Sequence, residues 1–154
     1  MSVKRGLSGI IMTVWTFISM VIIPLSTLTA LERGVTIRGE LIRVSIVALN
    51  KGMILMLGLL AMILTALSYS VSEKSEALLV FLKYVTVAYY EWVWAEGVKR
   101  LEIETPSGLV HVGVFLGLWI ILVIIGSIIT GLLKAICKYS EAIKKERKAK
   151  EKET

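Results

Sequence analysis

Three stretches of the chain are long and almost free of charged residues. Residues 8–30, 51–69 and 109–133 consist mostly of Ile, Leu, Val and Met, with small and hydroxyl-bearing residues between them. A helix needs about 20 apolar residues to cross a hydrocarbon core about 30 Å thick. The pattern therefore predicts three transmembrane helices, and Pro24 is expected to bend the first of them.

A fourth stretch, residues 77–95, is interrupted by Lys83 and Glu91, and its second half alternates β-branched and aromatic residues as a strand would. We interpret it as a fourth transmembrane helix, because aromatic residues near one end are typical of a membrane interface. The predicted fold is an all-α integral membrane protein with a four-helix transmembrane bundle in residues 1–137. The alternative is three transmembrane helices plus a small β-hairpin outside the membrane, formed by residues 85–105.

Short strands are also expected in the polar connections. The connection after the first stretch carries Arg33, Arg38 and Arg43, and the one before the last stretch carries Glu102 and Glu104. With four spans both connections lie on the same side of the membrane. We therefore expect these charges to pair across neighbouring strands.

Residues 138–154 form a basic, charged tail, in which Glu141–Lys145 and Glu146–Lys150 have the spacing of helical ion pairs. The last helix is therefore expected to continue into this tail. Basic residues favour the cytoplasmic side, although their counts do not separate four spans from three. The placement of Tyr and Trp favours four spans, so we predict a multi-pass cell-membrane protein with both termini in the cytoplasm.

Composition narrows the class of protein further. Hydrophobic residues make up 56% of the 154, and the net charge of +6 is confined to the ends and connections. No polar basic face is left for nucleic acid. All 12 acidic residues are Glu, Gln is absent, and Asn50 is the only Asn. Few thermolabile amides together with many Lys and Glu are typical of hyperthermophiles, so we expect an archaeal source.

The sequence contains few of the residue types that catalytic sites require. With only His111 and Cys137, the chain cannot build a His/Cys zinc site or a two-His haem site, and without Asp it cannot form a Ser-His-Asp triad. We therefore expect no enzyme activity, no cofactor and no metal.

Small residues form a stripe on the last apolar stretch. At 100° per residue, four of them fall within about 40° of one line along a helix. They are the predicted helix-packing residues Gly113, Gly117, Ser127 and Gly131. Gly113 and Gly117 form a GxxxG motif, which lets two membrane helices approach closely.

Similar stripes run along the first two stretches. The first consists of Gly9, Thr13, Thr16 and Thr27, with Ser19 at its edge, and the second of Lys51, Gly58 and Thr65, with Ala61 alongside. Stripes of this kind predict helix faces that pack against one another. The alternative interpretation is a narrow polar conduit lined by the hydroxyl groups.

Three charges are candidates for intramembrane positions: Lys51, Lys83 and Glu91. Such residues are functional candidates by default. Lys83 is within reach of the interface by snorkelling. Lys51 and Glu91 are expected at similar depth on the same side, so we hypothesise an ion pair between them.

The segment KRGLSGIIMTV, which begins at Lys4, resembles the cleavage region of archaeal type IV prepilins. The resemblance implies cleavage after Gly6 and assembly into a filament, with one hydrophobic helix followed by a β-rich head. The further apolar stretches of this chain depart from that pattern.

Two hypotheses about function follow. The leading one is a small non-catalytic structural or accessory subunit of a larger membrane assembly, which packs through its Gly-striped fourth helix. The alternative is a small homo-oligomeric channel or transporter for protons, ions or small solutes. The expected partners are the lipid bilayer and either other membrane subunits or further copies of the chain.

Overall fold

The computed structural model describes residues 3–37, 40–46, 49–114 and 117–153. Over these residues the chain forms four rods of helix and four short strands. The first rod is continuous and consists of α1 (Val3–Phe17), the π-helix η1 (Ile18–Ile22) and α2 (Ile23–Arg33). The others are α3 (Lys51–Ser70), α4 (Glu73–Val98) and α5 (Gly117–Glu153).

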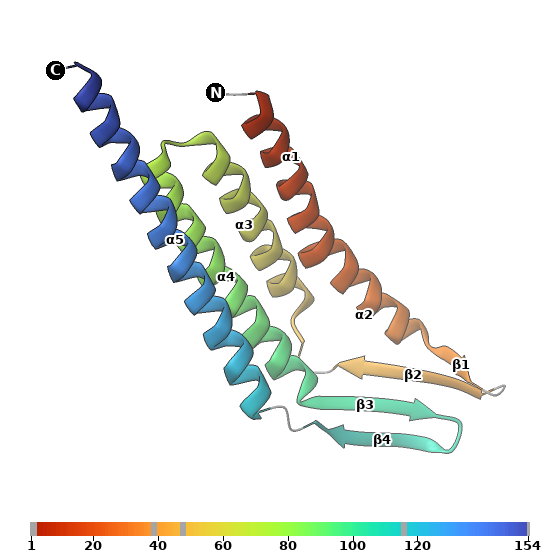
Figure 1. The fold of residues 1–154 in the computed structure, drawn as a ribbon. Coiled ribbons are helices and arrows are strands. Elements are labelled where there is room, and N and C mark those ends of the chain that lie inside the picture. Colours follow the sequence, from red (N-terminus) through yellow and green to blue (C-terminus); the bar gives the residue numbers. More distant parts are fainter. Residues whose placement is uncertain (1–2, 38–39, 47–48, 115–116, 154) are drawn as a thin grey trace.

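The helices stand side by side in a curved row rather than in a closed bundle (Figure 1). The first rod packs on α3, α3 packs on α4, and α4 packs on α5. Within the described residues, α1 and α5 stand at opposite ends of this row and do not close it. The prediction of a four-helix bundle is therefore wrong in this respect, because the predicted packing stripes pair neighbouring helices in turn.

The strands lie together at the end of the helices that is far from both termini (Figure 1). They are β1 (Val35–Ile37), β2 (Glu40–Ile46), β3 (Arg100–Thr105) and β4 (Gly108–Gly113). Antiparallel pairing joins β2, β3 and β4, and β1 pairs with the first residues of β2. Arg43 lies opposite Glu104 and forms an ion pair with it at 3.5 Å, which confirms the predicted cross-strand pairing. Arg38 lies outside the described residues.

The prediction of an all-α fold is wrong, and so is the start of the last span at residue 109. Residues 109–113 belong to β4, and α5 begins at Gly117. The reason is the turn Thr105-Pro106-Ser107-Gly108, in which Gly108 has φ +136°, a value that favours glycine. This turn folds β4 back on β3, so Gly113 is a strand residue and the GxxxG motif is not helical.

Helix α4 confirms the helical interpretation of residues 77–95 and contradicts the hairpin of residues 85–105. It begins with Glu73 and Glu76 in its first turn, where carboxylates interact favourably with the helix dipole. The aromatic residues Tyr90 and Trp94, four positions apart, face the same way and pack with Leu28, Leu49 and Ile54 in the core. Packing on one side therefore overrides the strand-like alternation of the sequence.

Pro24 causes the irregularity in the first rod. It has no N–H to donate to the carbonyl of Met20, four residues earlier, and its ring crowds that turn. The helix accommodates it through the π-helix η1. The Met20 carbonyl accepts a hydrogen bond from the Tyr90 hydroxyl of α4 at 2.8 Å, which joins the first rod to α4.

The first rod and α3 pack through small residues, as the sequence predicted. A Cβ on Gly58 would lie 2.9 Å from the Met20 carbonyl oxygen, so only glycine permits this approach. Thr16 and Thr65 are buried against each other with 3.5 Å between their hydroxyl oxygens. Each hydroxyl also donates to its own helix backbone, to Met12 and Ala61 respectively. These groups therefore contribute to packing and do not line an open conduit in this chain.

Three helices, Arg5–Arg33, Lys51–Ser70 and Gly117–Lys148, are long and apolar enough to cross a membrane among the described residues. They indicate a multi-pass membrane protein. The single hydrophobic helix of a type IV pilin does not match this architecture.

Replacing Tyr90 with Phe should destabilise the protein by about 1–2 kcal/mol, because the Met20 carbonyl then loses a hydrogen-bond donor in apolar surroundings. The measurement is unfolding in mixed micelles by denaturant titration. Tyr89→Phe is the matched control, because Tyr89 is exposed, and its effect should stay below about 0.5 kcal/mol. Equal effects of the two substitutions would contradict the assigned role of Tyr90.

Gly131 and Gly126 offer a second matched pair, both on α5. A Cβ on Gly131 would lie 2.3 Å from the Tyr84 Cβ, whereas one on Gly126 would meet nothing within 4 Å. We expect Gly131→Ala to cost about 1–3 kcal/mol, because α4 and α5 must separate. Gly126→Ala should be neutral or stabilising by up to about 1 kcal/mol. The same unfolding assay distinguishes them, and a harmless Gly131→Ala would show that the contact is not tight.

Candidate functional site: the trough between the outer helices

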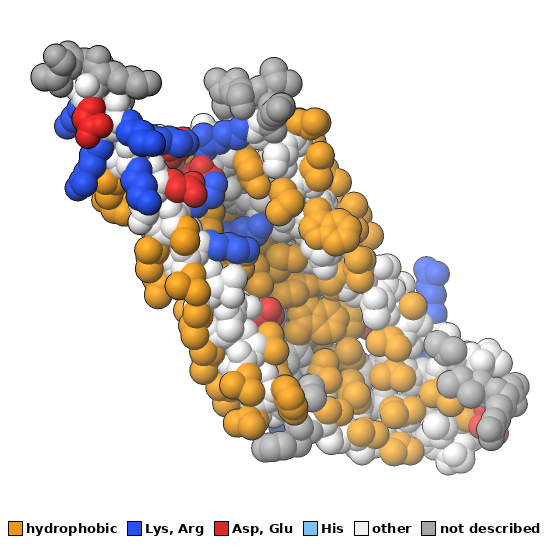
Figure 2. Space-filling view, in the orientation of Figure 1, with side chains coloured by type: hydrophobic (Ala, Val, Ile, Leu, Met, Phe, Trp, Pro, Cys, Tyr) orange, Lys and Arg blue, Asp and Glu red, His pale blue; other side chains and the backbone are white. Residues whose placement is uncertain are grey.

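The curved row of helices leaves an open trough on one face (Figure 2). Its walls are the first rod and α5, and its floor is α4 together with the end of α3. Residues of α4 at heptad spacing line it from Val80 to Val98, and this spacing keeps them on one face of the helix. Figure 2 shows the hollow as mostly hydrophobic, with basic and acidic side chains within it.

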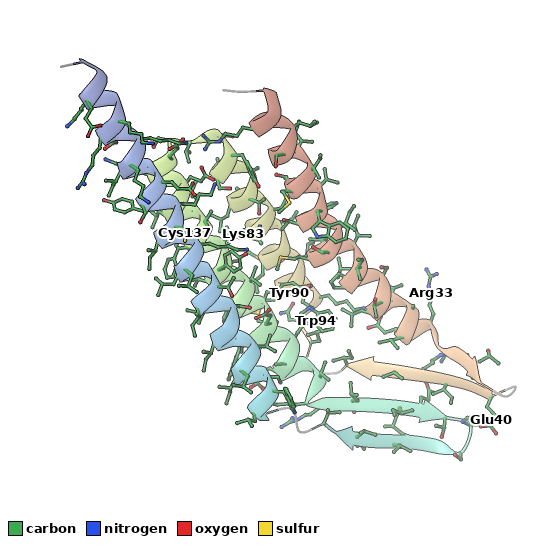
Figure 3. All side chains as sticks on the ribbon, in the orientation of Figure 1. Arg33, Glu40, Lys83, Tyr90, Trp94 and Cys137 are labelled. Atoms are coloured by element: carbon green, nitrogen blue, oxygen red, sulfur yellow. The ribbon has the colours of Figure 1, made fainter. Side chains whose placement is uncertain are left out.

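The half of the trough nearer the termini holds a cavity of about 420 Å³. Lys83 lies in it, between α5 and α3 (Figure 3). Lys134 of α5 donates to the Tyr84 hydroxyl and lies 4.9 Å from the centre of that ring. For Lys83 no described residue supplies a hydrogen-bond acceptor or a counter-ion. The cavity therefore contains a cation that the described part of the chain does not neutralise.

The half nearer the sheet holds a second cavity, of about 430 Å³. Pro24 and Ile120 form its two walls, and Glu91 of α4 lies in its floor. The Ser127 hydroxyl of α5 lies within hydrogen-bond distance of both carboxylate oxygens of Glu91, at 3.0 and 2.9 Å, and donates to them. One neutral donor satisfies only part of a carboxylate, which can accept several hydrogen bonds.

A buried carboxylate closes the trough at the end near the termini. Glu76 is only 5% exposed. Its two oxygens bind Arg5 of α1 at 2.6 Å and Lys138 of α5 at 2.7 Å. Arg5 also donates to the Val71 carbonyl at 3.3 Å. The two outer helices are thus joined to the same side chain of the floor.

Beyond Glu76 the tail part of α5 continues alongside the turn between α3 and α4. Lys145 donates to Glu73, and Lys74 pairs with Glu146 at 2.9 Å. The hydrogen bond from Lys145 lowers the pKa of Glu73, and the hydrogen bond to Glu146 raises the pKa of Lys74. These pairs confirm that the last helix continues into the tail.

The structure separates two residues that the sequence placed together. Lys51 pairs with Glu32 at the end of α2, at 2.5 Å, and Glu91 bonds to Ser127 instead. The hypothesis of a Lys51–Glu91 ion pair is therefore wrong. Lys51 opens α3 next to its capping residue Asn50, at the helix end, whereas Glu91 lies two turns inside α4.

The predicted packing stripe is retained only in part. Ser127 and Gly131 face α4 of the same chain, through Glu91 and Tyr84 respectively. Gly117 starts α5, and Gly113 lies in β4. The part of the stripe that packs is therefore used within the chain.

Sequence reasoning missed Glu76, Tyr84 and Tyr90 as contributors to the trough. Spacing is the signal for two of them, because Glu76, Lys83 and Tyr90 follow one another at intervals of seven residues on α4, and Tyr84 is the neighbour of Lys83 in the sequence. His111 was expected in the last helix but lies in β4, where it is exposed and faces Glu102 at 3.3 Å. Cys137 is exposed and lines the cavity near the termini.

Among the described residues, no group of His, Cys, Asp and Glu is arranged to hold a metal ion. The fold and the trough together define a multi-pass membrane protein with a partly covered helix layer. No family model matches the chain, and neither a curated protein nor a solved structure matches it.

Two double-mutant cycles test the environment of Glu91. Combining Glu91→Met with Ser127→Ala should give an interaction energy of about 0.5–2 kcal/mol in unfolding, because each substitution removes the same hydrogen bonds. Combining Glu91→Met with Lys51→Met should be additive within about 0.5 kcal/mol. Coupling in the second cycle and additivity in the first would contradict the observed pairing.

Proposed function

We propose that this chain is a small non-catalytic accessory subunit of a larger membrane assembly. The observation that carries the proposal is the open trough. Its floor helix α4 has packed neighbours on two sides, and none of the described helices lies over the trough. We also propose that α4 crosses the bilayer with the other three rods, with both termini in the cytoplasm. Its 26 residues reach about 39 Å, and the basic tail follows the positive-inside preference.

The half of the trough nearer the sheet is the proposed contact with another subunit. Its apolar walls would receive a helix or a bulky side chain, and Glu91 would accept a hydrogen bond from a polar group of the partner. An intramembrane carboxylate with one weak neutral donor gains most from such a partner, because lipid offers none. The Gly-striped fourth helix is not the contact in this proposal, because Ser127 and Gly131 already pack on α4.

A second candidate function is a homo-oligomeric channel or transporter. The observation in its favour is that Lys83 and Glu91 lie on the same open face of α4. If several copies turned this face to a common axis, both charges would line the path. Ion flux into proteoliposomes that is lost in Glu91→Gln would support this candidate, and absence of flux under any imposed gradient would exclude it.

Native mass spectrometry of the protein, solubilised gently from its own membranes, tests the leading proposal. We expect foreign subunits in stoichiometric amounts. Ile120→Trp fills the wall of the cavity and should release these subunits, whereas Ile121→Trp, at the next and exposed position of α5, should retain them. A species that contains only copies of this chain would contradict the accessory role.

A further inference from the structure

Lys83 is the feature of the trough that neither the fold nor the proposed function explains. It lies on α4 seven residues after Glu76, which is about 10 Å further into the membrane. It is partly buried, and no described residue binds its ammonium group. A cation that is held away from water in an apolar trough is costly unless an anion accompanies it.

The charges around Lys83 do not supply that anion. The cavity is lined by three lysines and two glutamates: Lys83, Lys134, Lys138, Glu76 and Glu141. Glu76 already binds Arg5 and Lys138. Glu141 follows Lys134 on α5 by seven residues, so it lies about 10 Å nearer the terminal end. Lys83 is instead repelled by the like charge of Lys134. A negative ligand placed between the two ammonium groups would remove this repulsion.

The depth of the two lysines matches the level of lipid phosphate. The uncharged part of α5 runs from Gly117 to Leu133, which is about 25 Å of helix and close to the thickness of a hydrocarbon core. Lys134 follows at once and therefore lies at the boundary between acyl chains and headgroups. From slightly deeper, the long side chain of Lys83 can reach the same level.

The rest of the cavity is suited to an acyl chain. Met12, Val80 and Leu133 line it, and the trough continues along α4 past Tyr90 to the second cavity, with its apolar walls. Tyr84 accepts a hydrogen bond from Lys134 and keeps its own O–H to donate. Polar donors at one end and an apolar channel below them together fit an anionic amphiphile better than a small anion.

We propose that the cavity nearer the termini binds the phosphate of an anionic membrane lipid, held by Lys83 and Lys134, with an acyl chain along the trough. Tyr84 donates a further hydrogen bond to a phosphate oxygen. The lipid forms part of the surface that an assembled subunit would contact. The site does not depend on the proposed subunit role, because an isolated chain contains every residue that it needs.

Lipid titration of the delipidated full-length chain in a non-ionic detergent tests this site. The probes are a short-chain phosphatidylglycerol, the matching phosphatidylcholine, and inorganic phosphate, with the bound lipid followed by native mass spectrometry. We expect phosphatidylglycerol to bind at least about tenfold more tightly than phosphatidylcholine, because charge-assisted hydrogen bonds from two ammonium groups favour the anionic lipid. Lys83→Met should weaken phosphatidylglycerol about tenfold, and Lys83→Arg should retain it.

Lys144→Met is the matched control, since Lys144 is an exposed lysine of α5, the helix that carries Lys134, and lies outside the cavity. At 0.15 M salt it should change the affinity less than about threefold. Equal losses in Lys83→Met and Lys144→Met would show diffuse attraction and overturn the proposal. Inorganic phosphate that binds as tightly as the lipid, and only with Lys83 present, would make this a free-anion site and overturn the lipid assignment. A melting curve for each variant confirms that it is folded, and Lys134→Met provides a second test should Lys83→Met not fold.

Discussion

The ion bridge at Glu76 determines how the helices are arranged. A carboxylate that is 5% exposed must be paired, and here it is paired twice, with Arg5 of the first rod and with Lys138 of α5. Since both partners lie on the same side of α4, the first rod and α5 are held as two walls rather than packed together. The hydrogen bond from Tyr90 to Met20 repeats this arrangement deeper in the membrane, on the side of the first rod only. The walls of the trough are therefore held by polar contacts at particular positions along α4.

Close packing elsewhere leaves the trough uncovered. Gly58 brings α3 against the irregular turn that Pro24 causes, and Gly131 brings α5 against Tyr84. These approaches pair each helix with its neighbour, and without a hydrophobic driving force in lipid such close contacts are a main source of association. These two glycines are used in contacts between neighbouring helices and do not draw α1 towards α5. Only 6% of the apolar window of α5 is buried within the chain, so most of this helix contacts lipid or another protein.

Much of the fold was predictable from the sequence, because bilayer thickness restricts the length of a span and small residues mark close contacts. The three apolar helices, the helical nature of α4, the contact of Gly58 and Thr65 with the first rod, and the Arg43–Glu104 pair all followed from pattern and spacing. The start of α5 did not, because the strand residues 109–113 are as apolar as a span and only the turn at Pro106–Gly108 distinguishes them. The partners of Lys51 and Glu91 were also missed. Two side chains expected at the same depth need not pair, because pairing also depends on which neighbouring helix each side chain faces.

Lys83 and Glu91 are charged residues of the trough on which the proposed binding sites depend. They are eight residues apart on α4, about 12 Å along the helix, too far for either charge to neutralise the other. Both nevertheless line the trough, which the described helices leave open. A charge inside lipid is costly, and the cost is offset only by a partner of opposite charge or by hydrogen bonds. Lys83 has no such partner among the described residues, and Glu91 has only the hydroxyl of Ser127. In our proposals the trough therefore receives two different partners, an anion beside Lys83 and a hydrogen-bond donor beside Glu91.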